Sequence, residues 1–167
     1  MGKSIVVAGY VPIDGEVNII PLMKSLHDLG HIILAPIDSQ VGCFSLWRDV
    51  IRGSQLVDDY IFNSSCVVEG EPMFGGVIAA PYMHCRRVCI DFKNVVSDMF
   101  YIIAPLISYD KNLNRLGFGK GWYDKTVFML RNKNKTVKLI GVAYKEQYCD
   151  SIPKEPHDVP LDYLCVS

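Results

Sequence analysis

The sequence has no long apolar run. No stretch approaches the ~18 consecutive apolar residues of a membrane-spanning helix. The opening segment from Met1 to Val7 is too short an apolar stretch, with too early a polar break, to serve as a signal peptide. Position 6 is Val6, so the serine or threonine of a myristoylation signal is also missing. These absences predict a cytoplasmic protein with no membrane partner.

Strong charge of either sign is also missing. The formal net charge of −1 gives no overall field that would attract nucleic acid, so any basic site must be local and we expect no nucleic-acid partner. The six cysteines show no paired C-x-x-C spacing, and we interpret them as reduced thiols. His84, Cys85 and Cys89 form the one Cys/His cluster, which has too few ligands for a tetrahedral zinc site.

The length and the apolar patterning predict one domain that spans residues 1–167. Half of the residues are hydrophobic and a fifth are charged, as in ordinary globular proteins. The β-branched run from Ser4 to Val11, closed by Pro12, predicts a buried strand. Helical spacing follows from Val17 to Leu29, and the segment from His31 to Ala35 predicts a second strand. This order is typical of a βαβ unit with parallel strands.

Later segments extend the same pattern. Apolar strands are predicted from Met99 to Ala104, from Val137 to Ala143 and from Tyr163 to Val166, the first of them central in the sheet. The broken apolar pieces from Asp38 to Pro72 are consistent with a short antiparallel excursion. The stretch from Met73 to Asp91 is interpreted as an insertion. The predicted fold class is therefore α/β, with an open, mainly parallel sheet and helices on both faces.

The stretch from Asn114 to Asp124 carries the strongest functional signal. Its glycines stand at every second position, at Gly117, Gly119 and Gly121. Without Cβ atoms the backbone can take positive φ and turn its N–H groups toward an anion. Arg115 and Lys120 add positive charge, and a helix that begins near Gly121 would direct its N-terminal dipole at the same anion. The alternative is a glycine-rich surface turn, but the flanking charged and aromatic residues favour a phosphate site.

Two common phosphate-binding loops are excluded by counting. A Walker A loop needs a glycine five positions before Gly119, where this chain has Asn114, and Ser or Thr after Lys120, where it has Gly121. A Rossmann fingerprint needs its third glycine at the position of Trp122. The loop is therefore of another kind.

Together with four further segments, this stretch resembles the 5-formyltetrahydrofolate cyclo-ligase family, also called methenyltetrahydrofolate synthetases. These segments are Gly9 to Asn18, Pro105 to Lys111, Leu139 to Gln147 and Glu155 to Asp162. The resemblance implies a ligase of one-carbon metabolism that converts 5-formyltetrahydrofolate to 5,10-methenyltetrahydrofolate. In that reaction the formyl oxygen attacks the γ-phosphate of ATP, N10 attacks the activated carbon, and ADP and phosphate are released.

The resemblance also implies the site residues. Lys120 and Arg115 are the expected catalytic groups. The expected ATP-binding residues are Arg115, Leu116, Gly117, Phe118, Gly119, Lys120, Gly121, Trp122 and Tyr123. The expected substrate-binding residues are Val11, Glu16, Phe118, Gly119, Lys120, Gly121 and Trp122. Asp124 and Asp158 are the expected Mg²⁺ ligands, which suits a cation that takes one or two carboxylates with phosphate oxygens.

Several alternatives stay open at this stage. Glu16 also suits the first turn of a helix, Asp124 and Asp158 also suit a helix start and a turn, and one of Trp122 and Tyr123 is expected in the core. Family members usually carry an N-terminal helical segment whose basic residues contact ATP. Here Met1 lies only a few residues before the first strand, so we expect weak, salt-sensitive ATP binding.

Three readings of the function remain at this point. The leading one is an active cyclo-ligase, expected to be a monomer or weak dimer. A catalytically weak or silent folate- or nucleotide-binding protein of the same fold is the second. The third is an unrelated flavodoxin-like nucleotide binder, which fits the βαβ pattern but not the C-terminal resemblance. One departure from the family pattern is Leu106, where a small residue is usual, and it predicts a different path for the loop that enters the pocket.

Overall fold

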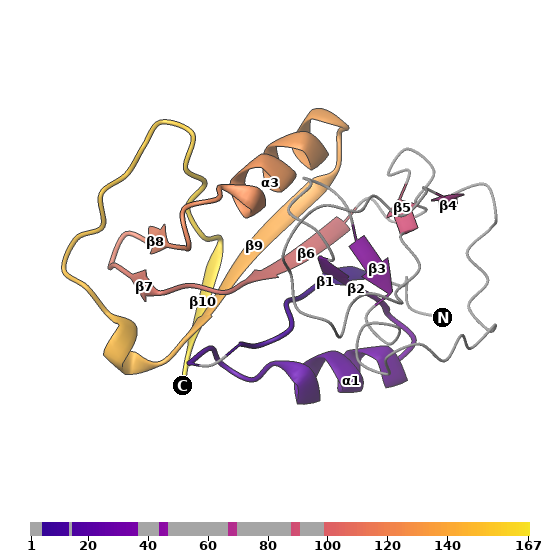
Figure 1. The fold of residues 1–167 in the computed structure, drawn as a ribbon, viewed down its shortest axis with the longest axis horizontal. Helices are drawn as coiled ribbons and strands as arrows, with labels where there is room; N and C mark the ends of the chain where they lie inside the picture. The colour runs from indigo at the N-terminus through magenta and orange to yellow at the C-terminus, as the bar shows by residue number, and fades with distance from the viewer. Residues whose placement is uncertain (1–4, 14, 37–43, 47–66, 70–87, 91–98) are drawn as a thin grey trace.

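The computed structural model describes residues 5–13, 15–36, 44–46, 67–69, 88–90 and 99–167 (Figure 1). The stretch from Met73 to Asp91, interpreted as an insertion, lies outside these residues except for one short strand. His84 and Cys85 also lie outside them. None of the helices in the described part of the chain is long and apolar enough to cross a membrane.

The N-terminal segment forms the predicted strand, helix and strand. β1 spans Val6–Ala8, α1 spans Ile20–Asp28 and β2 spans Ile32–Pro36, and β1 pairs with β2 in parallel. Gly30 has a φ of 83°, in the left-handed region that commonly follows a helix. The helix begins later than the apolar pattern predicted. Pro21 is the second residue of the helix, where the backbone N–H has no partner within the helix and its absence costs nothing. This favours the later start.

The central strands follow in the C-terminal half. β6 (Met99–Ala104) pairs in parallel with β1 on one side and with β9 (Thr136–Ala143) on the other, and β10 (Tyr163–Val166) pairs in parallel with β9. The helix α3 (Trp122–Asn132) connects β6 to β9 by way of a long loop. Over the described residues the sheet has the order β10-β9-β6-β1-β2-β3-β5-β4. The predicted open, mainly parallel sheet is confirmed.

Antiparallel strands extend the sheet beyond β2. These are β3 (Phe44–Leu46), β5 (Val88–Ile90) and β4 (Val67–Glu69), each antiparallel to its neighbour, as the predicted excursion requires. A separate antiparallel hairpin of β7 (Ser108–Tyr109) and β8 (Arg115–Leu116) interrupts the loop between β6 and α3. This hairpin was not predicted, and it leads directly into the glycine-rich stretch.

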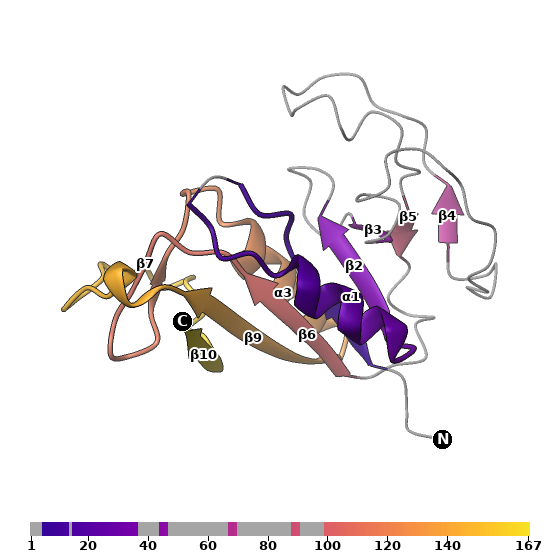
Figure 2. The same cartoon turned by 90° about the horizontal axis from the view of Figure 1, so that it is seen from below.

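The helices α1 and α3 cover opposite faces of the sheet (Figures 1 and 2). Alternate residues of β1 show the two faces, because Val6 and Ala8 belong to the core under α3 and Val7 to the core under α1. The core under α3 also contains Phe100, Ile102, Val127 and Leu130, and the core under α1 contains Ile19, Met23, Ile33 and Ile103. Met23 and Val127 are fully buried, and each such burial contributes about 1.5–3 kcal/mol to folding.

Candidate active site

The chain changes direction between β1 and β6. From β1 it passes through α1 to β2 on one side, and β6 later joins β1 on the other side. In open α/β sheets such a switch point leaves a crevice beyond the carboxyl ends of the strands, where ligands bind. Figure 2 shows the loop after β1 and the loop before α3 on the side to which the arrowheads of β6 and β9 point. The predicted residues Val11 and Glu16 lie in the first of these loops. The stretch from Arg115 to Asp124 begins in β8, passes through the second loop and ends in the first turn of α3.

The glycine-rich stretch forms an open backbone turn at the start of α3. Gly119 and Gly121 have φ values of 79° and 60°, in the left-handed region, whereas Gly117 does not adopt it. Gly121 is the residue that precedes the first turn of α3, so the predicted helix start is confirmed. A Cβ atom placed on Gly117 or Gly119 would meet no other atom within 4 Å. The open space beside these glycines would let a ligand approach the backbone closely.

Charged and aromatic side chains stand beside this turn. Lys120 is exposed, and it makes no ion pair with any other described residue. Phe118 is 62% exposed and Leu116 is 45% exposed, so both offer apolar surface beside the turn. Trp122 is buried in the core under α3 and meets the Tyr123 ring edge-on, with centroids 4.9 Å apart. Trp122 is therefore the aromatic residue that was expected in the core.

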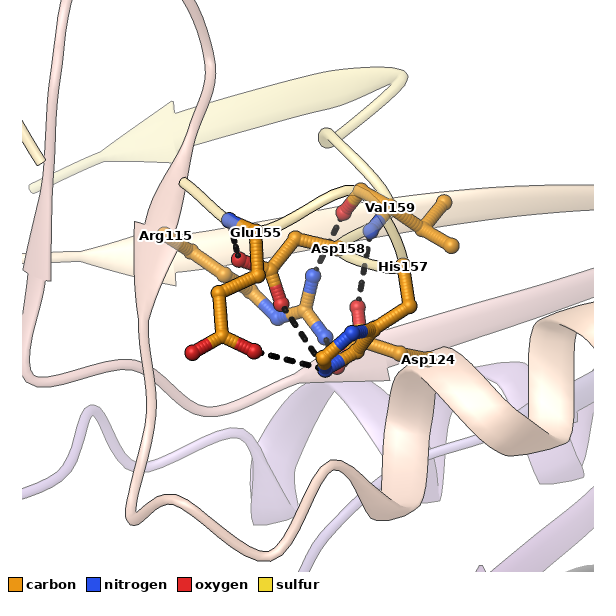
Figure 3. Close-up of polar contacts among 6 residues, drawn as sticks. All are labelled: Arg115, Asp124, Glu155, His157, Asp158 and Val159. Atoms are coloured by element: carbon orange, nitrogen blue, oxygen red, sulfur yellow. Dashed lines mark hydrogen bonds and ion pairs between the residues drawn. The ribbon is translucent and has the colours of Figure 1, made fainter. Parts of the chain in front are cut away.

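Arg115 makes a closed ring of hydrogen bonds instead of extending into solvent (Figure 3). Its Nη1 donates to the carbonyl of Val159 at 2.7 Å, and its Nη2 donates to Oδ2 of Asp124 at 2.9 Å. The N–H of Val159 donates to Oδ1 of Asp124 at 2.9 Å and closes the ring. The Arg115 and Asp124 side chains are 7% and 12% exposed. The ring joins β8, the first turn of α3 and the segment that contains Asp158.

The Asp158 carboxylate lies in a more exposed turn beside this ring (Figure 3). Its Oδ2 accepts a hydrogen bond from the Glu155 N–H at 2.8 Å. His157 Nε2 lies 3.3 Å from Glu155 Oε2 and 3.9 Å from Asp158 Oδ1. The Asp158 side chain is 38% exposed, so its Oδ1 can reach a ligand from solvent.

The predicted Mg²⁺ ligands differ in how well they suit a cation. Both oxygens of Asp124 already accept hydrogen bonds, one of them from the positively charged Arg115. Among the described residues, no Lys or Arg pairs with Asp158, and His157 Nε2 lies 3.9 Å from its Oδ1. The described residues contain no group of three or more His, Cys, Asp or Glu side chains placed to hold a metal, so Mg²⁺ would depend on phosphate oxygens for further ligands. These donors fit Mg²⁺ at Asp158, whereas at Asp124 the cation would share a carboxylate that is already paired with Arg115.

The hairpin that leads into the glycine turn is held by Asp110. Its Oδ1 accepts from the N–H groups of Asn112 and Asn114 at 2.9 and 3.0 Å, and its Oδ2 accepts from Asn114 Nδ2 at 2.9 Å and Ile152 N at 3.2 Å. Burial raises the pKa of Asp110, but the hydrogen bonds from Asn114, Asn112 and Ile152 hold it below its usual range. Leu113, inside this turn, has a φ of 62°, an uncommon conformation for a residue with a Cβ. Asp110 therefore stabilises a strained turn.

In the loop after β1, the charge of Glu16 acts on two tyrosines, Tyr10 and Tyr123. Glu16 is partly buried and its Oε2 accepts from the Ile13 N–H at 2.9 Å. Burial raises the pKa of Glu16, partly offset by the Ile13 hydrogen bond. Burial also raises the pKa of Tyr10 and of Tyr123, and the negative charge of Glu16 raises both further. The Glu16 carboxylate therefore lies in the electrostatic reach of both hydroxyls, one after β1 and one in α3.

Sequence reasoning missed two members of this group. Tyr10 follows β1, and Tyr144 directly follows β9, where it adds to the rise in the pKa of Tyr10. Their positions after the carboxyl ends of neighbouring parallel strands are a signal that could have found them. Val11, predicted to contact substrate, is partly buried against the core under α1.

Comparison with known proteins shows the family of the chain. The sequence profile of the 5-formyltetrahydrofolate cyclo-ligase family matches residues 1–167. The chain belongs to this family. The 5-formyltetrahydrofolate cyclo-ligase of Mycolicibacterium smegmatis is 27% identical over 160 residues, which cover 95% of this chain and 71% of the relative. That of Haemophilus influenzae is 39% identical over 75 residues, 43% of this chain and 38% of the relative.

A solved structure shares the fold. The 5,10-methenyltetrahydrofolate synthetase from Mycoplasma pneumoniae superposes with a TM-score of 0.57 at 20% sequence identity, over 95% of this chain and 71% of that chain. The predicted family and fold class are confirmed, and the named relatives are ligases that act on a folate. The chain thus spans less than two thirds of the length of some of the relatives that it matches.

Proposed function

We propose that this chain catalyses the ATP- and Mg²⁺-dependent conversion of 5-formyltetrahydrofolate to 5,10-methenyltetrahydrofolate, with release of ADP and phosphate. The observation that supports this most is the open glycine turn before α3, which lies at the switch point of the sheet in a member of the cyclo-ligase family. The chain would act in the cytoplasm as one domain of residues 1–167, as a monomer or weak dimer.

The nucleotide end of the proposed site is the glycine turn. Its amides and the start of α3 would receive the phosphates of ATP, and the exposed ammonium of Lys120 would approach the γ-phosphate. Phosphoryl transfer depends on alignment and charge neutralisation more than on a protein nucleophile. Phe118 and Leu116 would supply exposed apolar surface beside the turn for a ring of either substrate.

The folate end of the proposed site is the loop after β1. The partly buried carboxylate of Glu16 would accept hydrogen bonds from N–H groups of the pterin or orient the formyl group. The charge of Glu16 raises the pKa of Tyr123, which lies in the first turn of α3, directly after the glycine turn. The folate end and the glycine turn would therefore lie close to each other. This arrangement would place the formyl oxygen and the γ-phosphate within one crevice, the geometry that an intermolecular attack needs.

Magnesium would neutralise charge on the phosphates when bound, with Asp158 the better-suited ligand and Asp124 the second. Arg115 would position other groups of the site and would not bind phosphate directly, because its guanidinium already donates to Val159 and Asp124. Its guanidinium fixes the Val159 backbone, and through it the adjacent Asp158 turn, beside the glycine turn.

The formation of methenyltetrahydrofolate tests this function. The full chain is mixed with 5-formyltetrahydrofolate, ATP and Mg²⁺, and the methenyl absorbance is followed. We expect an absorbance rise that is lost when any one component is omitted. Binding of folate or nucleotide by the folded chain without any absorbance rise would instead identify a silent binding protein.

A further inference from the structure

Tyr10 has a ring buried in the core and a hydroxyl that donates a hydrogen bond to the loop before α1. The residue is 3% exposed, and its ring belongs to the core under α1 together with Val7, Ile19 and Met23. Its hydroxyl donates a hydrogen bond to the carbonyl of Val17 at 2.7 Å. A phenylalanine would fill the same space in the core, so packing alone does not account for the hydroxyl.

The acceptor of this hydrogen bond is the residue next to Glu16. α1 begins at Ile20, so the carbonyl of Val17 lies outside the hydrogen-bond ladder of the helix. Glu16 itself is held by a reciprocal pair, in which its N–H donates to the Ile13 carbonyl at 3.0 Å and its Oε2 accepts from the Ile13 N–H at 2.9 Å. Tyr10 therefore ties the end of the loop that carries Glu16 to the end of β1.

This tie starts two residues after β1, an interior strand of the sheet. β1 is paired on both sides, with β2 and β6, and the Gly9 N–H continues the pairing by donating to the Leu34 carbonyl at 2.9 Å. A Cβ atom on Gly9 would lie 2.5 Å from Met23 Cε, so α1 packs closely against the strand just before Tyr10. Because the Tyr10 ring is held beside β1, its hydroxyl can fix the backbone at Val17 and so the position of the neighbouring Glu16.

We propose that Tyr10 is a positioning residue for Glu16. It does not contact the substrate, and it acts by fixing the backbone at Val17 so that the Glu16 carboxylate faces the crevice. The effect on folate affinity rests on the proposed function, whereas the effect on the loop does not. The hydroxyl is thus a determinant of how tightly the folate substrate is held.

The loop is tested directly with Tyr10→Phe, which keeps the ring and removes only the hydroxyl. Hydrogen exchange of the Ile13 and Glu16 amides should become about fivefold faster, the scale of one net hydrogen bond. The matched control is Tyr163→Phe, which removes an exposed hydroxyl on β10 and should leave both amides unchanged. Unchanged exchange in Tyr10→Phe, with the fold intact, overturns the proposal whether or not the chain has activity.

Its consequence for substrate binding is tested by a double-mutant cycle with Glu16→Gln. Tyr10→Phe should raise the KM for 5-formyltetrahydrofolate about fivefold and leave kcat and the KM for ATP unchanged. In the Glu16→Gln background the same change should have no further effect, because Tyr10 acts through Glu16. Additive effects of the two substitutions would contradict this route. If the wild-type chain shows no turnover, the proposed function fails and the exchange measurement still decides the positioning role.

Discussion

Lys120 and Arg115 carry the same charge in the same eleven-residue stretch, but their surroundings separate their roles. Lys120 is exposed beside the open glycine turn, whereas the Arg115 side chain is 7% exposed and bound to Asp124 and Val159. An exposed cation can stabilise negative charge that develops on a phosphate in the transition state. A buried cation that already donates hydrogen bonds to the protein mainly stabilises the surrounding structure.

The first prediction concerns Lys120. Lys120→Ala should lower kcat by about 10²–10³, the effect of removing one preorganised electrostatic group, and should leave the unfolding midpoint unchanged because the side chain is exposed. Initial rates and thermal unfolding measure the two effects. Lys24→Ala, an exposed lysine on α1, is the control. Near-normal activity of Lys120→Ala would show that the glycine turn does not bind the reacting phosphate.

The second prediction compares the two predicted Mg²⁺ ligands. Asp124→Asn and Asp158→Asn should each raise the Mg²⁺ concentration needed for half-maximal activity, by about 10–100-fold. Asp124→Asn should in addition lower the free energy of unfolding by about 3–5 kcal/mol, because it leaves the buried Arg115 without its counter-charge. Metal titration of the initial rate and denaturant unfolding separate the effects. An unchanged Mg²⁺ requirement in both variants would exclude both residues as metal ligands.

At the scale of elements, the hairpin β7–β8 depends on one buried carboxylate. The pKa of Asp110 is lower in the folded chain than in the unfolded chain, where it is about 3.9. Its contribution to stability is therefore present above that value and is lost as the pH falls through the folded pKa. The hairpin should weaken in acid for this reason.

The third prediction follows from this pKa. Asp110→Asn should lower the free energy of unfolding by about 1–3 kcal/mol at neutral pH, because its amide group would face N–H donors. The difference from wild type should shrink as the pH falls below about 4 toward the lower pKa of Asp110 in the folded chain, at which the wild-type carboxylate takes up a proton. Denaturant unfolding at a series of pH values measures this difference, and a difference that stays constant down to the lowest pH would contradict the assignment.

A close contact between β9 and the loop after β6 gives the fourth prediction. A Cβ atom on Gly141 would lie 2.5 Å from Leu161 Cδ1 and 3.0 Å from Leu106 Cδ2, and both leucines are buried. Gly141→Ala should therefore cost about 1–3 kcal/mol of stability by overpacking. Gly117→Ala is the control for stability, since a Cβ there meets nothing within 4 Å. Equal unfolding midpoints of the two variants would contradict the close packing.

Apolar runs and glycine positions in the sequence predicted two strands and the start of one helix correctly. The strands Met99–Ala104 and Tyr163–Val166 have the predicted bounds, because each is an apolar run closed by a turn or by the chain end. The start of α3 was predicted from Gly121, which takes the left-handed conformation that glycine favours. The hairpin β7–β8 was not predicted, because its strands are too short for any alternation to show.

Features of the site that depend on distant parts of the chain could not be predicted from the sequence. Arg115 was expected at the phosphate, and its partner Val159 lies 44 residues away. No local sequence pattern predicts a hydrogen bond between residues so far apart in the chain. Tyr10 was missed for a different reason, since a tyrosine at the end of an apolar strand is typical of a core residue and its hydrogen bond to Val17 depends on how the loop folds back.

For the whole molecule, the proposed function requires two substrates to meet at the switch point of the sheet. The glycine turn with Lys120 lies before α3, and Glu16 with Tyr10 lies after β1. If the formyl oxygen of the folate attacks the γ-phosphate there, ATP cleavage and ring closure are one coupled reaction. A chain that only binds nucleotide, or only binds folate, would show no such coupling.

The stoichiometry of phosphate release tests this coupling most directly. The full chain is supplied with limiting 5-formyltetrahydrofolate and excess ATP and Mg²⁺, and inorganic phosphate and the methenyl product are measured in the same reaction. We expect one phosphate released for each methenyltetrahydrofolate formed, with phosphate release ending when the folate is consumed. Phosphate release that continues without folate, or methenyl formation without phosphate, would contradict it.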